Sequence, residues 1–80
     1  MKYKSSGHRA VSADTWQQAV ETFALMKARR AYGREAGARV VRIDNYGIDG
    51  GYVEVEAFIG LSTKPGEVIG RNVMFTVRQA

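Results

Sequence analysis

The sequence predicts an α+β fold in which one amphipathic helix packs on an antiparallel sheet of three or four strands. Two observations point to this class. Apolar residues in the first half recur with the helical period of about 3.6 residues, whereas two stretches of the second half alternate apolar and polar residues as strands do. The chain has 80 residues, so we expect one domain over residues 1–80.

The helix is expected over about residues 13–32. Ser12 or Asp14 can cap its first turn, and Gln17 follows Asp14 at the spacing of a capping box. Gly33 is the first stop signal after the apolar pattern, and Gly37 is the second. The stripe expected to face the core consists of Trp16, Ala19, Val20, Phe23, Ala24 and Ala31, with Lys27 at its centre.

A second apolar strip runs along the opposite face of the helix. Leu25, Ala28 and Tyr32 line up there at helical spacing. Either the strip is covered by the N-terminal segment or partly exposed, or it is a contact surface for a second copy of the chain or another protein.

Strands are expected over about 39–44, 52–61 and 68–78, and the segment around 8–11 is a candidate edge strand. The last two strands should form a hairpin in which odd residues face odd residues. Examples are Val55 near Val73 and Val53 near Phe75. The sheet face away from the helix would then carry Tyr52, Glu54, Glu56, Phe58, Asn72, Met74, Thr76 and Arg78.

The residues expected of an enzyme are missing. The chain has no cysteine, and its one histidine, His8, is expected in a loop or at the surface. One histidine supplies too few ligands for zinc, and it has no cysteine nucleophile to activate. Glu54 and Glu56 share a strand face where both should be ordinary ionised acids. The glycine-rich stretch 44–51 lacks the acid spacing of a calcium loop and is interpreted as a plain loop. We therefore expect no catalysis, no metal and no cofactor.

Membrane association is not expected either. The sequence has no apolar run near the ~20 residues of a membrane helix, and no apolar core of a signal peptide near its start. A reducing, cytoplasmic setting fits the absence of cysteine.

Positive charge is concentrated in the first half of the chain. The net charge is +4 overall, with +6 on residues 1–42 and −2 on residues 43–80. The segment from Lys27 to Arg42 contains six basic residues, and Lys27, Arg30 and Arg34 share one side if the helix continues past Tyr32. This segment either binds an anionic partner, to which arginine is suited, or is a solvated helix end whose charge favours the helix dipole.

The whole chain resembles the small phage-encoded anti-CRISPR proteins. The similarity lies in the capped helix that starts S-A-D-T-W-Q-Q-A at Ser12, the strands from Val40 to Val77, and the absence of a catalytic motif. The resemblance implies a protein that binds a type I CRISPR surveillance complex, with type I-C favoured, and blocks recognition of target DNA. Many such inhibitors are acidic DNA mimics, whereas this chain is basic, which favours contact with a Cas subunit or guide RNA.

Three hypotheses follow: an inhibitor that binds CRISPR effector Cas subunits, a small basic nucleic-acid-binding accessory protein, or a small homodimer built on the second apolar strip. In the first two the chain is a monomer or a weak homodimer. The candidate contact residues are Lys27, Arg29, Arg30, Arg34, Arg39, Arg42, Leu25, Tyr32, Tyr52, Glu54, Glu56 and Phe58.

Overall fold

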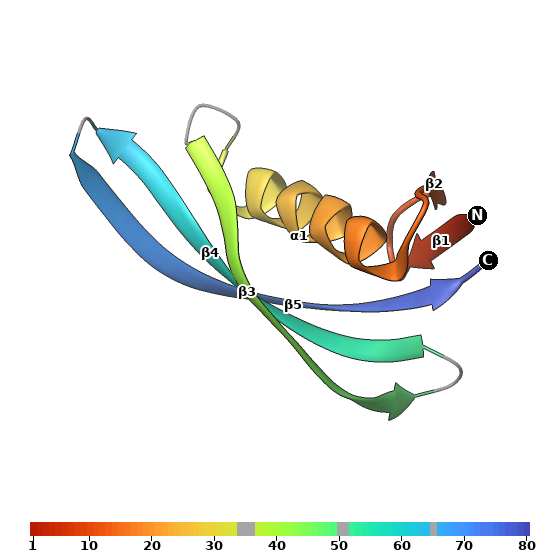
Figure 1. Ribbon diagram of the computed structural model, residues 1–80. Coiled ribbons are helices and arrows are strands. Elements are labelled where there is room, and N and C mark those ends of the chain that lie inside the picture. The colour runs from red at the N-terminus through yellow and green to blue at the C-terminus, as the bar shows by residue number, and fades with distance from the viewer. Residues whose placement is uncertain (34–36, 50–51, 65) are drawn as a thin grey trace.

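The computed structural model describes the backbone of residues 1–33, 37–49, 52–64 and 66–80, and their side chains except at positions 37, 46–49, 63 and 64. Its elements are β1 (Lys2–Ser5), β2 (Val11–Ser12), α1 (Trp16–Tyr32), β3 (Gly37–Asp49), β4 (Tyr52–Lys64) and β5 (Glu67–Gln79). The strands form one antiparallel sheet in the order β2-β1-β5-β4-β3, with α1 on one face (Figure 1). The predicted α+β class is confirmed, but the sheet has five strands rather than three or four.

The additional strand comes from the N-terminal segment. The edge strand expected around 8–11 is instead two short strands, β1 and β2, on either side of a turn that contains His8. β1 pairs with β5, with Tyr3 opposite Gln79 and Ser5 opposite Val77. This pairing places β5 inside the sheet, between β1 and β4.

The helix begins at Trp16, three residues later than predicted, because Thr15 caps it instead of Ser12 or Asp14. The Thr15 hydroxyl accepts a hydrogen bond from the Gln18 N–H at 3.2 Å. Gln18 Oε1 in turn accepts a hydrogen bond from the Asp14 N–H at 3.0 Å. The capping residues are therefore Thr15 and Gln18, each one position later than the expected Asp14 and Gln17. Gly33 ends the helix as predicted, with φ 91° and its N–H donating to the Arg29 carbonyl at 2.9 Å.

The core lies between the helix and the sheet, and it corrects two predictions about the helix. Ala28, expected on the second apolar strip, is fully buried, whereas Ala31, expected in the core, is exposed. The last helical turn extends past the core, which explains Ala31. Ala28 belongs to the buried cluster, against which Ala38 and Val40 of β3 also pack. The buried apolar residues are Tyr3, Ala19, Val20, Phe23, Ala24, Ala28, Val55, Ala57, Ile59, Leu61, Val73, Phe75 and Val77.

The β4–β5 hairpin has the predicted parity but a different register. Val55 pairs with Phe75 and Val53 with Val77, so odd residues face odd residues, two positions away from the expected partners. The two strands extend to Lys64 and Glu67, so the turn is tighter than the sequence indicated.

Residues 44–49, interpreted from sequence as part of a loop, continue strand β3. They pair with β4 up to Asp49 opposite Tyr52. β3 has two irregularities, between Val40 and Arg42 and between Asn45 and Gly47. Such bulges bend a strand, and β3 follows the strong curvature of the sheet in Figure 1.

Candidate functional site

The turn between β1 and β2 brings His8 under the helix. The His8 N–H donates to the Ser5 carbonyl at 3.1 Å, and Gly7 has φ 83°, as the third position of a type II turn requires. Lys4 Nζ donates to the His8 carbonyl at 2.8 Å. His8 is 6% exposed, and its ring centroid lies 6.2 Å from that of Phe23. The histidine therefore lies in a loop, as one predicted alternative had it, but it is buried and not at the surface.

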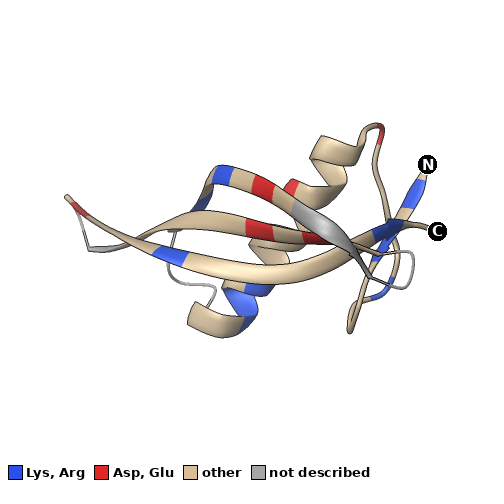
Figure 2. Cartoon of the chain, turned by 90° about the horizontal axis from the view of Figure 1, so that it is seen from below, with Lys and Arg blue, Asp and Glu red and all other residues tan. Residues whose placement is uncertain are grey.

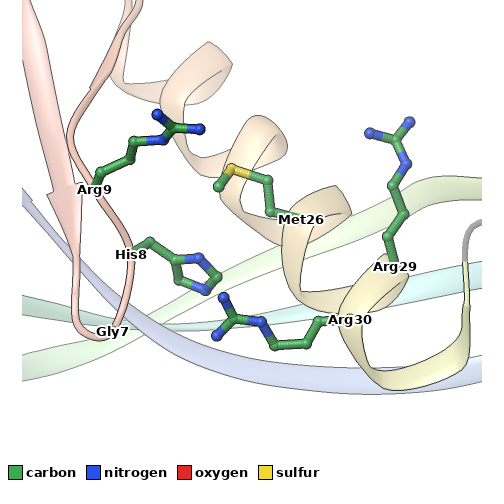
Figure 3. A pocket seen from close by; sticks show the side chains of 6 residues that line it. All are labelled: Gly7, His8, Arg9, Met26, Arg29 and Arg30. Carbon is green, nitrogen blue, oxygen red and sulfur yellow. The ribbon is translucent and has the colours of Figure 1, made fainter.

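A pocket of about 680 Å³ lies between this turn and the second half of α1 (Figure 3). We call it the basic pocket. Arg9 lies on one side of the Met26 side chain and Arg29 on the other, while Arg30 extends from the helix toward the His8 ring. Its lining among the described residues contains no acidic side chain. The lining residues are Gly7, His8, Arg9, Met26, Arg29 and Arg30.

The surroundings of His8 favour its neutral form. Burial lowers the pKa of His8 below its ordinary value of 6.5, and the positive charges of Arg30, Lys27 and Lys4 lower it further. The His8 Nε2 atom is buried and has no hydrogen-bond partner among the residues that the structure describes. A buried polar atom in this state is uncommon in folded proteins.

Charge at a helix end does not by itself indicate a binding site. Arg29 and Arg30 lie in the last turn of α1, where positive side chains favour the helix dipole. Arg9, however, comes from a different segment and has no such role, yet it lines the same pocket. Guanidinium groups bind phosphate and carboxylate oxygens in pairs, so this arrangement is suited to an anionic group.

The sheet face away from the helix carries a second set of predicted residues. The Arg42 guanidinium lies 6.0 Å from the Phe58 ring centroid and its Nε is 3.1 Å from Asp44 Oδ2, while the Arg78 guanidinium lies 5.3 Å from the Tyr52 ring centroid. Cations over aromatic rings stabilise such exposed pairs modestly. Of the remaining residues named here from sequence, Glu54 and Met74 are exposed and Glu56 is half-buried.

Most of the predicted contact residues lie at two surfaces. Arg29 and Arg30 line the basic pocket, and Lys27 is half-buried near His8. Tyr52, Glu54, Glu56, Phe58 and Arg42 belong to the open sheet face. Figure 2 shows acidic residues along the middle of the sheet and basic residues at the helix end behind it.

Three predicted contact residues lie apart from both surfaces, and a fourth is not among the residues that the structure describes. Arg39 lines a separate pocket with Gly60 and Val68. Leu25 is half-buried and Tyr32 is 40% exposed, and the buried Ala28 between them interrupts the second apolar strip. Arg34 lies outside the residues that the structure describes, and the helix of the described part ends at Tyr32.

Sequence reasoning missed His8, Arg9 and Met26 as pocket residues. The Ser6-Gly7 pair is a turn signal that precedes His8 and Arg9 directly. That signal predicts a turn, but not the side of the helix on which the turn packs.

No protein family, curated protein or solved structure matches the chain. Among the described residues, no helix is both long and apolar enough to cross a membrane. Within that same part of the chain, no three histidine, aspartate or glutamate side chains gather in a way that would hold a metal ion.

Proposed function

We propose that this chain is a non-enzymatic binding protein that contacts a nucleic-acid-containing assembly through the basic pocket. One observation carries the proposal: Arg9 and the pair Arg29 and Arg30 come from different segments and line one pocket. Phosphate contacts dominate the affinity of most nucleic-acid-binding proteins, and arginine is well suited to make them.

The assembly that we propose is a type I CRISPR surveillance complex, with type I-C favoured, whose recognition of target DNA the protein blocks. The resemblance to small anti-CRISPR proteins supplies this partner. A complex built from Cas subunits around a guide RNA offers the phosphate groups that a basic pocket requires. The net charge of +4 is compatible with such a contact and unfavourable for mimicry of DNA.

The test is co-elution of the purified protein with a type I complex in size-exclusion chromatography, followed by a gel-shift assay of target DNA binding. We expect a stable complex that no longer shifts target DNA. The variant R9Q/R29Q/R30Q should lose both effects. A control with the same change in charge, R39Q/R71Q/R78Q, should keep them, because these exposed residues lie on strands β3 and β5 and do not line the basic pocket.

Failure of the unmodified protein to co-elute with type I complexes, with target DNA binding intact, would overturn this assignment. Equal loss in the two triple variants would show that net charge, rather than the basic pocket, is responsible.

The second candidate function is an accessory protein that binds free nucleic acid. The same pocket favours it, since three arginines can neutralise phosphates without any protein partner. Such binding weakens steeply with salt, by roughly 0.7 to 0.9 in log affinity per log unit of salt for each phosphate contact. A shift of free DNA or RNA at low salt that the pocket variant abolishes supports this function, and no shift at low salt excludes it.

A further inference from the structure

We propose that the basic pocket binds one phosphate group of a nucleic-acid strand, and that His8 Nε2 supplies a hydrogen bond to it. The inference rests on the proposed function and names the chemical group that this pocket takes. Its basis is the position of His8 at the base of the pocket, together with three guanidinium groups that line it.

The three arginines line the pocket from two segments of the chain. Arg9 approaches from the N-terminal turn, whereas Arg29 and Arg30 are consecutive residues of α1. A phosphate has oxygens directed to several sides, so it can accept hydrogen bonds from more than one guanidinium at once. Met26 adds an apolar surface beside these groups, which suits a sugar or base next to the phosphate.

His8 provides the observation that points to a ligand. The residue is 6% exposed and lines the pocket, yet Nε2 has no hydrogen-bond partner among the described residues. A buried polar atom left in this way is unfavourable, and a phosphate oxygen would supply the partner. Because Arg30 is exposed, its guanidinium can turn from the ring toward the phosphate and uncover Nε2.

Binding should also change the protonation of His8. The charged groups that face it are Lys4 on β1, and Lys27 and Arg30 on α1, and Arg9 follows it in the chain. Burial disfavours the imidazolium ion in the free protein, and the positive charges of Arg30, Lys27 and Lys4 disfavour it further. A phosphate anion reverses that balance, so the bound protein takes up a proton, and affinity should rise as the pH falls.

The experiment uses the chain with its histidine labelled with ¹³C and ¹⁵N. Since His8 is the one histidine of the sequence, its ring gives a single set of NMR signals. Three probes are titrated at constant ionic strength: inorganic phosphate, a short single-stranded oligonucleotide, and the same oligonucleotide with a 5′-phosphate. We expect the His8 signals to shift and the pKa of His8 to rise.

Two comparisons identify the contacts. R29Q and R30Q should each weaken binding by about tenfold or more, the effect of losing a charge-assisted hydrogen bond. R71Q, a matched control on exposed β5, should bind as the unmodified protein does. H8Q should bind the unphosphorylated oligonucleotide with an affinity independent of pH over about pH 5–8, where histidine titrates and a phosphodiester does not.

The three probes also identify the source of the phosphate. Equal binding of the two oligonucleotides supports a backbone phosphate, whereas binding of only the 5′-phosphorylated strand and inorganic phosphate supports a terminal phosphate. His8 signals that none of the probes moves would overturn the inference.

Failure of the inference can be separated from failure of the proposed function. If the protein still engages its complex or free nucleic acid, and R9Q/R29Q/R30Q abolishes this while the His8 signals stay unchanged, the proposed function stands without the phosphate site. Loss of the arginine dependence as well would overturn both.

Discussion

The ring of Phe58 lies on Gly70 of the neighbouring strand, in the space that a side chain at position 70 would occupy. Phe58 pairs with Asn72, so the contact is diagonal across β4 and β5. Gly70 itself pairs with Gly60. A glycine at position 70 therefore leaves room for the far end of the Phe58 ring, whose centroid lies 6.0 Å from the Arg42 guanidinium.

This contact predicts that G70A destabilises the protein by about 1–3 kcal/mol, the usual cost of overpacking. The backbone at Gly70 does not have a positive φ, so the loss would come from the displaced Phe58 ring. The measurement is the free energy of unfolding in urea.

Two further variants serve as controls. G60A should change stability by less than G70A, because the nearest atom to a Cβ there is Val68 Cγ1 at 3.4 Å, a side-chain methyl group that can shift. In an F58A background, G70A should no longer destabilise. If G70A lowered the free energy of unfolding as much in F58A as in the unmodified protein, Phe58 would not be the cause.

The helix start predicts a specific effect of T15A. Removing the hydroxyl that accepts the Gln18 N–H should cost about 0.5–2 kcal/mol of stability. S12A and D14A, which remove the caps suggested by the sequence, should each cost less than T15A. Urea unfolding of the three variants tests this ranking, and a larger loss in D14A would contradict the observed cap.

Ala28 and Ala31 form a matched pair on the same helix. A28L places extra methylene groups into a fully buried site and should cost about 1–3 kcal/mol. A31L lies on the exposed last turn and should be close to neutral. Thermal unfolding of both variants checks the orientation of the helix, and a reversed order would contradict it.

Stability should depend on pH through His8. Its pKa is lowered in the folded state, mainly by burial, so the unfolded chain binds a proton more readily. The contribution of neutral His8 to the free energy of unfolding should therefore be fully present above the ordinary pKa of 6.5 and decrease as the pH drops below it. Unfolding midpoints of the unmodified protein and H8Q across this range should show a steeper acid loss in the unmodified protein. Parallel curves would show that other groups cause the loss.

The sequence predicted local features better than long-range ones. The helix ending at Gly33 and the odd parity of β4 and β5 depend on residues close together in the chain, and both are confirmed. The pairing of β1 with β5 joins residues more than 70 positions apart, and no local pattern encodes it. Val11 and Ser12 were too few to show strand periodicity.

The candidate site was predicted only in part, for the same reason. Arg29 and Arg30 were found because they are part of a dense basic segment. His8 joins them because the Ser5–His8 turn folds back under α1, where desolvation and three nearby cations lower its pKa. A lone histidine in a polar segment has no pattern that predicts burial, so its role emerges only from the packing of the turn on the helix.

The Ala80 N–H donates a backbone hydrogen bond of 2.9 Å to the Lys2 carbonyl, at the outer end of the β1–β5 pairing. A force that pulls residues 2 and 80 apart acts first on this bond and then reaches Tyr3 opposite Gln79 and Lys4 opposite Arg78 in turn. The load therefore peels the two strands open one rung at a time instead of shearing all rungs together. A molecular motor that pulls on either strand would therefore meet little mechanical resistance before Tyr3 leaves the core on which the helix packs.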